Sequence, residues 1–171
     1  MPLVRLVIVA AVLTGAACAP VEQGSGLLVL ERTITLPNVA GRVDHLAIDP
    51  GRRHLIVAEL GNNSVDVVDL ARGAVMHRIA GLQEPQGLAF DSSGRVIVVA
   101  EGGGAVRLFD ALSFAAIAVI PLDADADNVH ADPRNGHIVV GYGSGGLAIL
   151  DVASRTVLSR ISLSAHPEGF Q

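Results

Sequence analysis

Short apolar runs rich in β-branched residues alternate with turn residues along most of the chain. The segment Glu84–Pro121 contains four such runs, and its turns include Asp-Ser-Ser-Gly and Gly-Gly-Gly. Valine and isoleucine favour strands, and clusters of Gly, Asp and Ser favour turns, so the segment predicts four short strands. No window after residue 20 keeps a 3.6-residue apolar period, and we therefore expect almost no helix there.

The same pattern occurs three times. Asp69, Asp110 and Asp151 each follow an apolar run, and they recur at one constant spacing. A period of about 40 residues with four strands per unit is typical of a β-propeller blade. We therefore predict an all-β propeller whose four-stranded antiparallel blades, about three in number, are Arg42–Ala80, Glu84–Pro121 and Asp125–Ser162.

Strands are expected both within the first blade and outside the three units. The strands of the first blade should be Val43–Asp49, His54–Glu59, Ser64–Asp69 and Ala74–Ile79. Outside the units, an outer strand is expected at Leu27–Leu36, and a fourth inner strand should begin at His166. Propellers usually have four to eight blades, so we expect a truncated propeller, a fragment of a longer one. Missing blades or self-association would then be needed to cover the open blade faces and close the ring.

The N-terminal segment has the pattern of an export signal followed by a tether. A single charge, Arg5, precedes an apolar run that ends in small residues, which predicts a signal peptide over residues 1–17. The only cysteine, Cys18, follows directly and resembles the lipidated residue of bacterial lipoproteins. Cleavage by the ordinary signal peptidase is the alternative. We expect a tether over 18–26, a partial propeller over 27–171, and an exported periplasmic protein held at a membrane only through a lipid anchor.

The blade pattern resembles a known bacterial family. Pro85–Asp91, Ala105–Asp110 and Asn63–Asp69 look like the YVTN-type propeller repeat, although its Tyr-Val-Thr-Asn signature is degraded to Ile56–Glu59 and Val98–Glu101. The resemblance implies an extracytoplasmic propeller, commonly of seven blades, and no particular activity.

Charge excludes one class of partner. The formal net charge is −5, all twelve basic residues are Arg without a basic run, and only one Tyr and four Phe are available for stacking. Phosphate binding needs a basic surface and single-strand binding needs aromatic residues, so we expect no nucleic-acid partner.

Two columns of polar residues begin the inner strands. Aligning the repeats gives Asp44, Gln86, Asp127 and Glu168 in one column, and His45, Gly87, Asn128 and Gly169 in the next. Inner strands surround the propeller channel, so we expect a ligand site at its mouth made of Asp44, His45, Gln86, Asp127, Asn128, His166 and Glu168. Asp44, Asp127 and Glu168 are the candidate ligands of a divalent cation such as calcium. The structural alternative is that these side chains cap strand ends.

Other candidate motifs do not match known ligand-binding sequences. The run Asp123–Asn128 lacks the Gly and Glu that an EF-hand loop requires, and Gly102–Gly104 joins two strands, unlike a phosphate loop. His77 is expected to be exposed and His130 to be packed near the inner strand. No catalytic residue is assigned.

Three functions remain open from the sequence. We expect a non-enzymatic binding or scaffold module that meets an unknown protein or small ligand. The alternatives are a metal-dependent hydrolase of the lactonase kind, with Asp44, Asp127 and Glu168 as ligands and His45 as proton carrier, and a purely structural envelope protein. Fold alone does not choose among them.

Overall fold

The computed structural model describes residues 28–49, 51–167 and 169–170. The chain forms two compact units, residues 1–32 and 33–171. In the first unit only residues 28–32 are described, and Leu28, Val29 and Leu30 are exposed. The predicted signal peptide, Cys18 and the tether lie outside the described residues, as does Glu168. No helix in the described part of the chain is long and apolar enough to cross a membrane.

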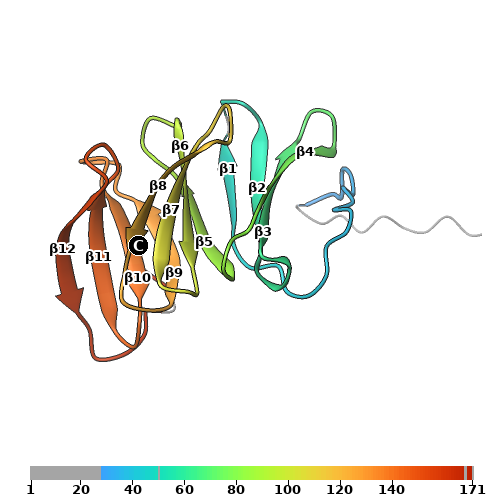
Figure 1. The fold of residues 1–171 in the computed structure, drawn as a ribbon. Coiled ribbons are helices and arrows are strands. Elements are labelled where there is room, and N and C mark those ends of the chain that lie inside the picture. The colour runs from blue at the N-terminus through green and yellow to red at the C-terminus, as the bar shows by residue number, and fades with distance from the viewer. Residues whose placement is uncertain (1–27, 50, 168, 171) are drawn as a thin grey trace, which may run out of the picture. The chain divides into compact units, whose positions relative to one another are not determined.

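The second unit contains three four-stranded antiparallel sheets, which confirms the all-β prediction (Figure 1). Within each sheet the strands follow one another in chain order. Sheet one is β1 (Leu46–Asp49), β2 (His54–Glu59), β3 (Ser64–Asp69) and β4 (Ala74–Ala80). Sheet two is β5 (Pro85–Phe90), β6 (Val96–Glu101), β7 (Ala105–Asp110) and β8 (Ala116–Pro121). Sheet three is β9 (Ala126–Ala131), β10 (Ile138–Tyr142), β11 (Gly146–Asp151) and β12 (Thr156–Ser162).

The repeated aspartates hold the turns. The Asp69 side chain accepts hydrogen bonds from the backbone N–H groups of Ala71 and Arg72, at 2.8 and 2.9 Å. Asp110 makes the equivalent pair with Leu112 and Ser113. Hydrogen bonds from these amides favour the ionised carboxylate and lower the pKa of both aspartates. The recurrence of Asp therefore reflects turn geometry and not a shared active site.

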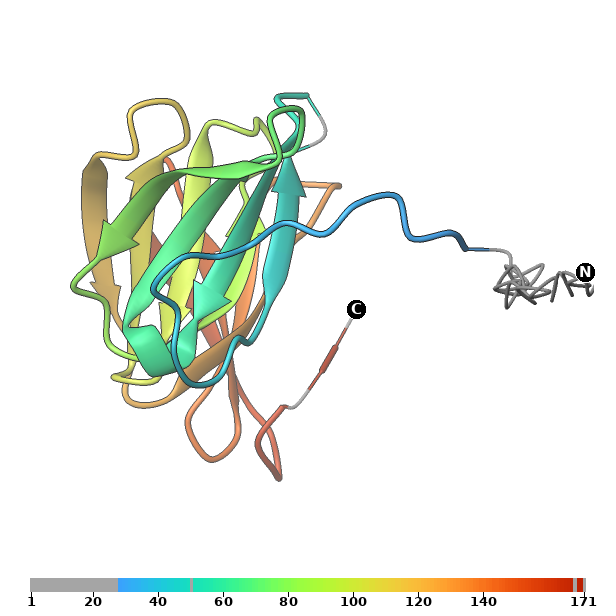
Figure 2. The ribbon, with the colours of Figure 1, turned by 90° about the vertical axis from the view of Figure 1, so that its right-hand side faces the viewer.

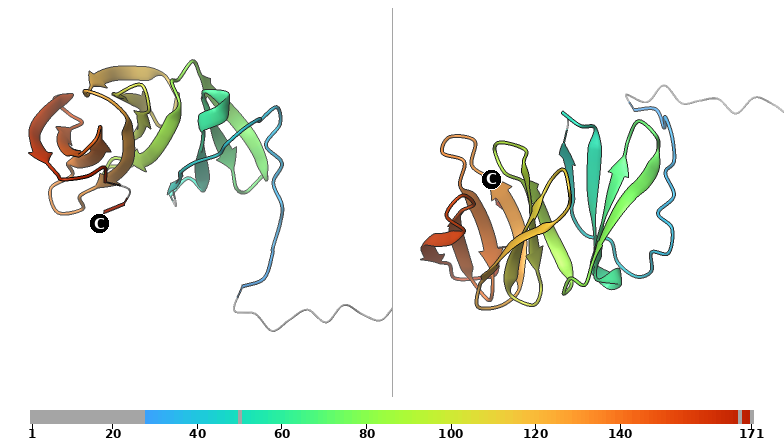
Figure 3. Two further views of the ribbon diagram at one scale, coloured as in Figure 1. Left: turned by 90° about the horizontal axis from the view of Figure 1, so that it is seen from below. Right: turned by 45° about the horizontal axis from the view of Figure 1, so that its top comes forward.

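Two apolar layers hold the three sheets together in the order one, two, three (Figure 3). Ile56, Val65 and Val67 of sheet one pack with Ile97 and Val99 of sheet two. On the other face of β6, Val98 and Ala100 pack against sheet three. Alternate residues of one strand thus serve different layers, as the pleat requires. Val98 is fully buried, as expected for the middle of a blade.

Three predicted strands differ from the observed ones. Residues 28–36 form no strand, and neither do the described residues after Ser162, although both segments were expected to pair. A strand requires a neighbour to complete its hydrogen bonds, and the described strands all pair within their own four-stranded sheets. The first inner strand begins at Leu46 and not at Val43, because the chain bulges at Asp44 and His45. Figure 2 faces sheet one, with β1 to β4 side by side.

Candidate functional site

A β-bulge lies at the start of each inner strand. Ala58 of β2 accepts a hydrogen bond from the Asp44 N–H and donates one to the His45 carbonyl. Asp44 and His45 therefore both lie opposite Ala58. In β5 the register shifts between Pro85 and Leu88, and in β9 it shifts opposite Val140 and Tyr142. The extra residues are therefore Asp44-His45, Gln86-Gly87 and Asp127-Asn128. Bulges redirect side chains, and here they occur at the residues of both polar columns.

The bulges bring together side chains from sheets one and three. His45 Nε2 lies 3.2 Å from Asn128 Oδ1, a hydrogen bond between residues far apart in the sequence. His45 Nδ1 lies 3.2 Å from Asp44 Oδ1 and 3.8 Å from Asp127 Oδ1. His166 Nε2 approaches Asp127 Oδ2 to 3.6 Å. We call Asp44, His45, Asp127, Asn128 and His166 the mouth cluster.

Gly87 makes this convergence possible. It occupies the column between His45 and Asn128, and β5 lies against both β1 and β9. A Cβ atom on Gly87 would lie 1.7 Å from the Asp127 carbonyl oxygen and 2.8 Å from Val129 Cγ2. Only glycine therefore allows sheet three to approach sheet two this closely. The absence of a side chain on sheet two also leaves the space through which His45 reaches sheet three.

Asp127 is a largely buried carboxylate of the mouth cluster. Its side chain is 15% exposed. Burial raises its pKa, and the two neighbouring histidines oppose that rise only in part. Two buried atoms of the cluster, Asp127 Oδ1 and His45 Nδ1, have no hydrogen-bond partner among the described residues. Such atoms are costly in a folded protein unless water or a ligand engages them, which makes the cluster a candidate binding site.

Not every predicted site residue joins the cluster. Gln86 is buried, and its Nε2 donates to Asp125 Oδ1 at 2.9 Å, so it fixes the turn before β9. Glu168 lies outside the described residues. Within residues 28–49, 51–167 and 169–170, no group of three or more His, Cys, Asp or Glu side chains is arranged to hold a metal ion. The three-carboxylate metal site therefore stays a prediction.

The aspartates of the run 123–128 do not converge. Asp123 is exposed and pairs with Arg160, Asp125 accepts a hydrogen bond from Gln86, and Asp127 faces the histidines.

The sequence predicted an exposed His77 and a packed His130, and only the first prediction is confirmed. His77 is exposed, as expected, and stacks on Phe114 with ring centroids 4.7 Å apart. His130 is exposed on β9 beside Phe170, because the face of sheet three that carries it has no neighbouring sheet in the described part of the chain.

Charged side chains on the second, third and fourth strands form contacts that the sequence analysis did not predict. In sheet one, Arg78 makes two 2.7 Å hydrogen bonds to the fully buried Asp66 and approaches the fully buried Glu59 to 3.5 Å. In sheet two, Arg107 Nε lies 3.3 Å from Glu101. In sheet three, Arg160 lies over the Tyr142 ring, 5.2 Å from its centroid. The only sequence signal was that Glu59 and Glu101 end the second strand in successive repeats.

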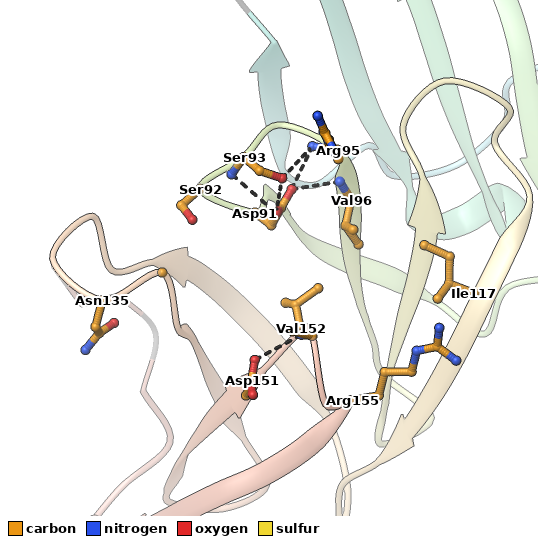
Figure 4. Close-up of a pocket in the computed structure, with 12 residues that line it drawn as sticks. Asp91, Ser92, Ser93, Arg95, Val96, Ile117, Asn135, Asp151, Val152 and Arg155 are labelled. Carbon is orange, nitrogen blue, oxygen red and sulfur yellow. Dashed lines mark hydrogen bonds between the residues drawn. The ribbon is translucent and has the colours of Figure 1, made fainter.

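A hollow of about 410 Å³ lies at the opposite end of the sheets (Figure 4). Its walls are the turns after β5, β9 and β11, together with Val96 of β6 and Ile117 of β8. The Asp91 side chain accepts from the amides of Arg95 and Val96 and from the Ser93 hydroxyl. Asp151 is engaged in the same way by Ala153 and Ser154. The carboxylates there shape turns, so the mouth cluster remains the better candidate.

Comparison with known proteins supports the fold. No protein-family model and no curated protein matches the chain. A solved structure of hydrazine synthase from Kuenenia stuttgartiensis is similar, with a TM-score of 0.69 and 18% identity over 81% of this chain. The match spans 40% of that protein's chain. At this identity the likeness concerns the fold alone.

Proposed function

We propose that this chain is a non-enzymatic binding module built from part of an exported β-propeller of the YVTN type. The repeat, with its period of about 40 residues, and the three stacked sheets support the propeller assignment. The leader and Cys18 support export and a lipid anchor. The ligand site of the module is the mouth cluster.

One observation carries the binding proposal. Asp127 Oδ1 and His45 Nδ1 come from different sheets, lie 3.8 Å apart, and are buried without hydrogen bonds to the described residues. Two carboxylates and two imidazoles at one place favour a positively charged ligand. We therefore propose a small cationic ligand, either a divalent cation or an ammonium group.

Calorimetric titration tests this proposal. CaCl₂, ZnCl₂ and methylammonium chloride are added separately to the full chain at pH 7.5. We expect one of the three probes to bind at one site per chain, and Asp127→Asn to weaken that binding at least about tenfold. Asp123→Asn is the matched control, because Asp123 is 79% exposed and outside the mouth cluster. The absence of binding for all three probes contradicts the proposal.

The same preparations address the hydrolase alternative. That hypothesis needs a metal held by Asp44, Asp127 and Glu168, and no described contact favours it over simple binding. Metal content after dialysis and lactone hydrolysis with added CaCl₂ are measured together. Stoichiometric metal, together with a hydrolysis rate that disappears in the Asp44→Ala and Asp127→Ala variants, would show that the chain is an enzyme and not a simple binding module.

A further inference from the structure

Residues 33–42 cross the face of sheet one that is turned away from sheet two (Figure 2). We call this segment the strap. Its three large apolar side chains before Gly41 are half-buried: Ile34, Leu36 and Val39. Arg78 of β4 ties the strap to the sheet, since its guanidinium donates hydrogen bonds to the carbonyl oxygens of Pro37 and Asn38, at 2.9 and 3.4 Å.

The strap lies where the other two sheets have a neighbouring sheet. Val57 of β2 is 2% exposed on this face, and its equivalents Val99 and Val140 are fully buried against the preceding sheet. The described part of the chain contains three sheets and none beyond sheet one on this side. The strap therefore shields a surface that sheet packing shields elsewhere in the molecule.

A group of buried charges lies beneath the strap. Glu59 of β2 and Asp66 of β3 are fully buried on this face, and Arg78 of β4 approaches both. The strap adds no charged side chain over residues 33–41. Arg42, at its end, is exposed and pairs with a carboxylate of the mouth cluster instead. The elements around this group thus supply two carboxylates and one guanidinium, an excess of one negative charge.

A retained proton would relieve that excess. Glu59 Oε2 accepts a hydrogen bond from the Ser64 hydroxyl at 2.6 Å, whereas the buried Oε1 atom receives none from the described residues. A proton shared between Glu59 and Asp66 would satisfy this atom and leave one charge for Arg78. Burial raises the pKa of Glu59 and the adjoining Asp66 raises it further, while Ser64 and Arg78 oppose the rise only in part.

The equivalent positions of sheet two are balanced. Glu101 corresponds to Glu59, and Arg107 stands where sheet one has Asp66; the two side chains lie 3.3 Å apart. Arg107 also donates to the Gly81 carbonyl, in the connection that enters sheet two, at 3.4 Å. An arginine thus holds the entering segment in both sheets, but of the two it is sheet one that carries an excess carboxylate.

We propose that the strap is a pH-sensitive cover, closed while Glu59 and Asp66 share a proton and released when that proton is lost. Without the proton, two buried carboxylates repel each other and must be hydrated, which requires the strap to lift. Closure is fully favoured below the ordinary Glu pKa of about 4.3 and is lost as pH rises through the raised pKa of Glu59. This inference does not depend on ligand binding at the mouth cluster.

Hydrogen exchange of two equivalent amides, followed by NMR in the full chain, tests the proposal. The Gly61 N–H donates to the Arg42 carbonyl of the strap at 3.0 Å, and in sheet two the Gly102 N–H donates to the Glu84 carbonyl at 2.9 Å. Protection factors correct for the intrinsic effect of pH on exchange. Between pH 5 and pH 7.5 we expect the protection factor of Gly61 to fall at least about tenfold, and that of Gly102 to stay unchanged.

Glu59→Gln should keep the strap closed at both pH values, because a neutral amide takes the place of the protonated carboxyl. Glu101→Gln is the matched control, and Gly61 should respond to pH in it as in the wild type. If Glu59→Gln does not fold, the wild-type comparison of Gly61 with Gly102 still decides. Equal protection of Gly61 at both pH values, a response that persists in Glu59→Gln, or a parallel loss of protection at Gly61 and Gly102 would each overturn the proposal.

Discussion

Asp127 shows how one buried carboxylate links stability to pH. Its pKa is raised by burial, so the folded chain holds this proton more tightly than the unfolded chain does. The resulting stabilisation is complete below the ordinary Asp pKa of about 3.9 and is lost as pH rises through the raised pKa. Above that range the folded protein bears the cost of a buried charge.

Asp127→Asn should remove this cost, since the amide is neutral at every pH. We expect equal stability of variant and wild type near pH 3.5, and a melting temperature at pH 7.5 that is higher in the variant by at least about 2 °C, or roughly 1 kcal/mol for a chain of this size. Thermal unfolding followed by circular dichroism measures both. Asp123→Asn should change neither value. A lower melting temperature for Asp127→Asn at pH 7.5 would mean that the histidines stabilise the carboxylate more than burial destabilises it.

Arg78 compensates two carboxylates that are fully buried, Glu59 and Asp66. Removal of the arginine would leave both without a positive partner, and breaking a buried pair from one side typically costs about 3–5 kcal/mol. Urea unfolding of Arg78→Met should show a loss of this size. Arg160→Met is the control, because Asp123, its partner, is exposed, and surface ion pairs contribute about 0–1 kcal/mol. Equal losses of unfolding free energy in Arg78→Met and Arg160→Met would contradict the claim that Arg78 compensates buried carboxylates.

Much of the residue-level chemistry was predictable from the columns. The repeat placed Asp44 with Asp127 and His45 with Asn128. His45 does contact Asn128, and both carboxylates approach its Nδ1 atom. Gln86 shares the first column yet binds Asp125, because a neutral amide can donate to the turn before β9. The Arg78, Glu59 and Asp66 group could not be predicted, since its charges lie on three strands and only single members recur, Glu59 as Glu101 and Arg78 as Arg160.

At the scale of the elements, the repeat predicted the strand boundaries well. In the first blade the second, third and fourth strands begin and end within one residue of their predicted positions, because Asp and Gly turns mark their ends. The bulges escaped prediction, since an extra residue in one strand is visible only against its partner. The strand expected before the first blade was wrong over residues 28–36, because β-branched composition indicates a strand whether or not a neighbouring strand exists.

Gly87 is the element-scale position most sensitive to substitution. A methyl group there would overlap the Asp127 backbone, so sheets two and three must separate. We expect Gly87→Ala to destabilise the chain by several kcal/mol, measured by urea unfolding, because backbone cannot yield as a flexible side chain can. Gly169→Ala is the matched control, since nothing described lies within 4 Å of its added carbon. Unchanged stability of Gly87→Ala would show that the two inner strands lie further apart than described.

At the scale of the whole molecule, three equivalent sheets place the starts of their inner strands side by side. Sheet two contributes a glycine where sheet one contributes His45 and sheet three contributes Asn128. The site therefore depends on the order of the three sheets and not on any single one. For this reason the sequence motifs of a single repeat indicated a fold but no activity.

The most direct test of this account is an NMR measurement of the histidine ring C–H signals in the full chain. We expect Asp127→Asn to shift the signals of both His45 and His166, which approach different oxygens of that carboxylate. The cation that binds in calorimetry should shift the same two signals in the wild type and leave His137, which lies outside the mouth cluster, unchanged. A His45 signal that responds to neither the substitution nor the cation would show that sheets one and three do not meet at a common site.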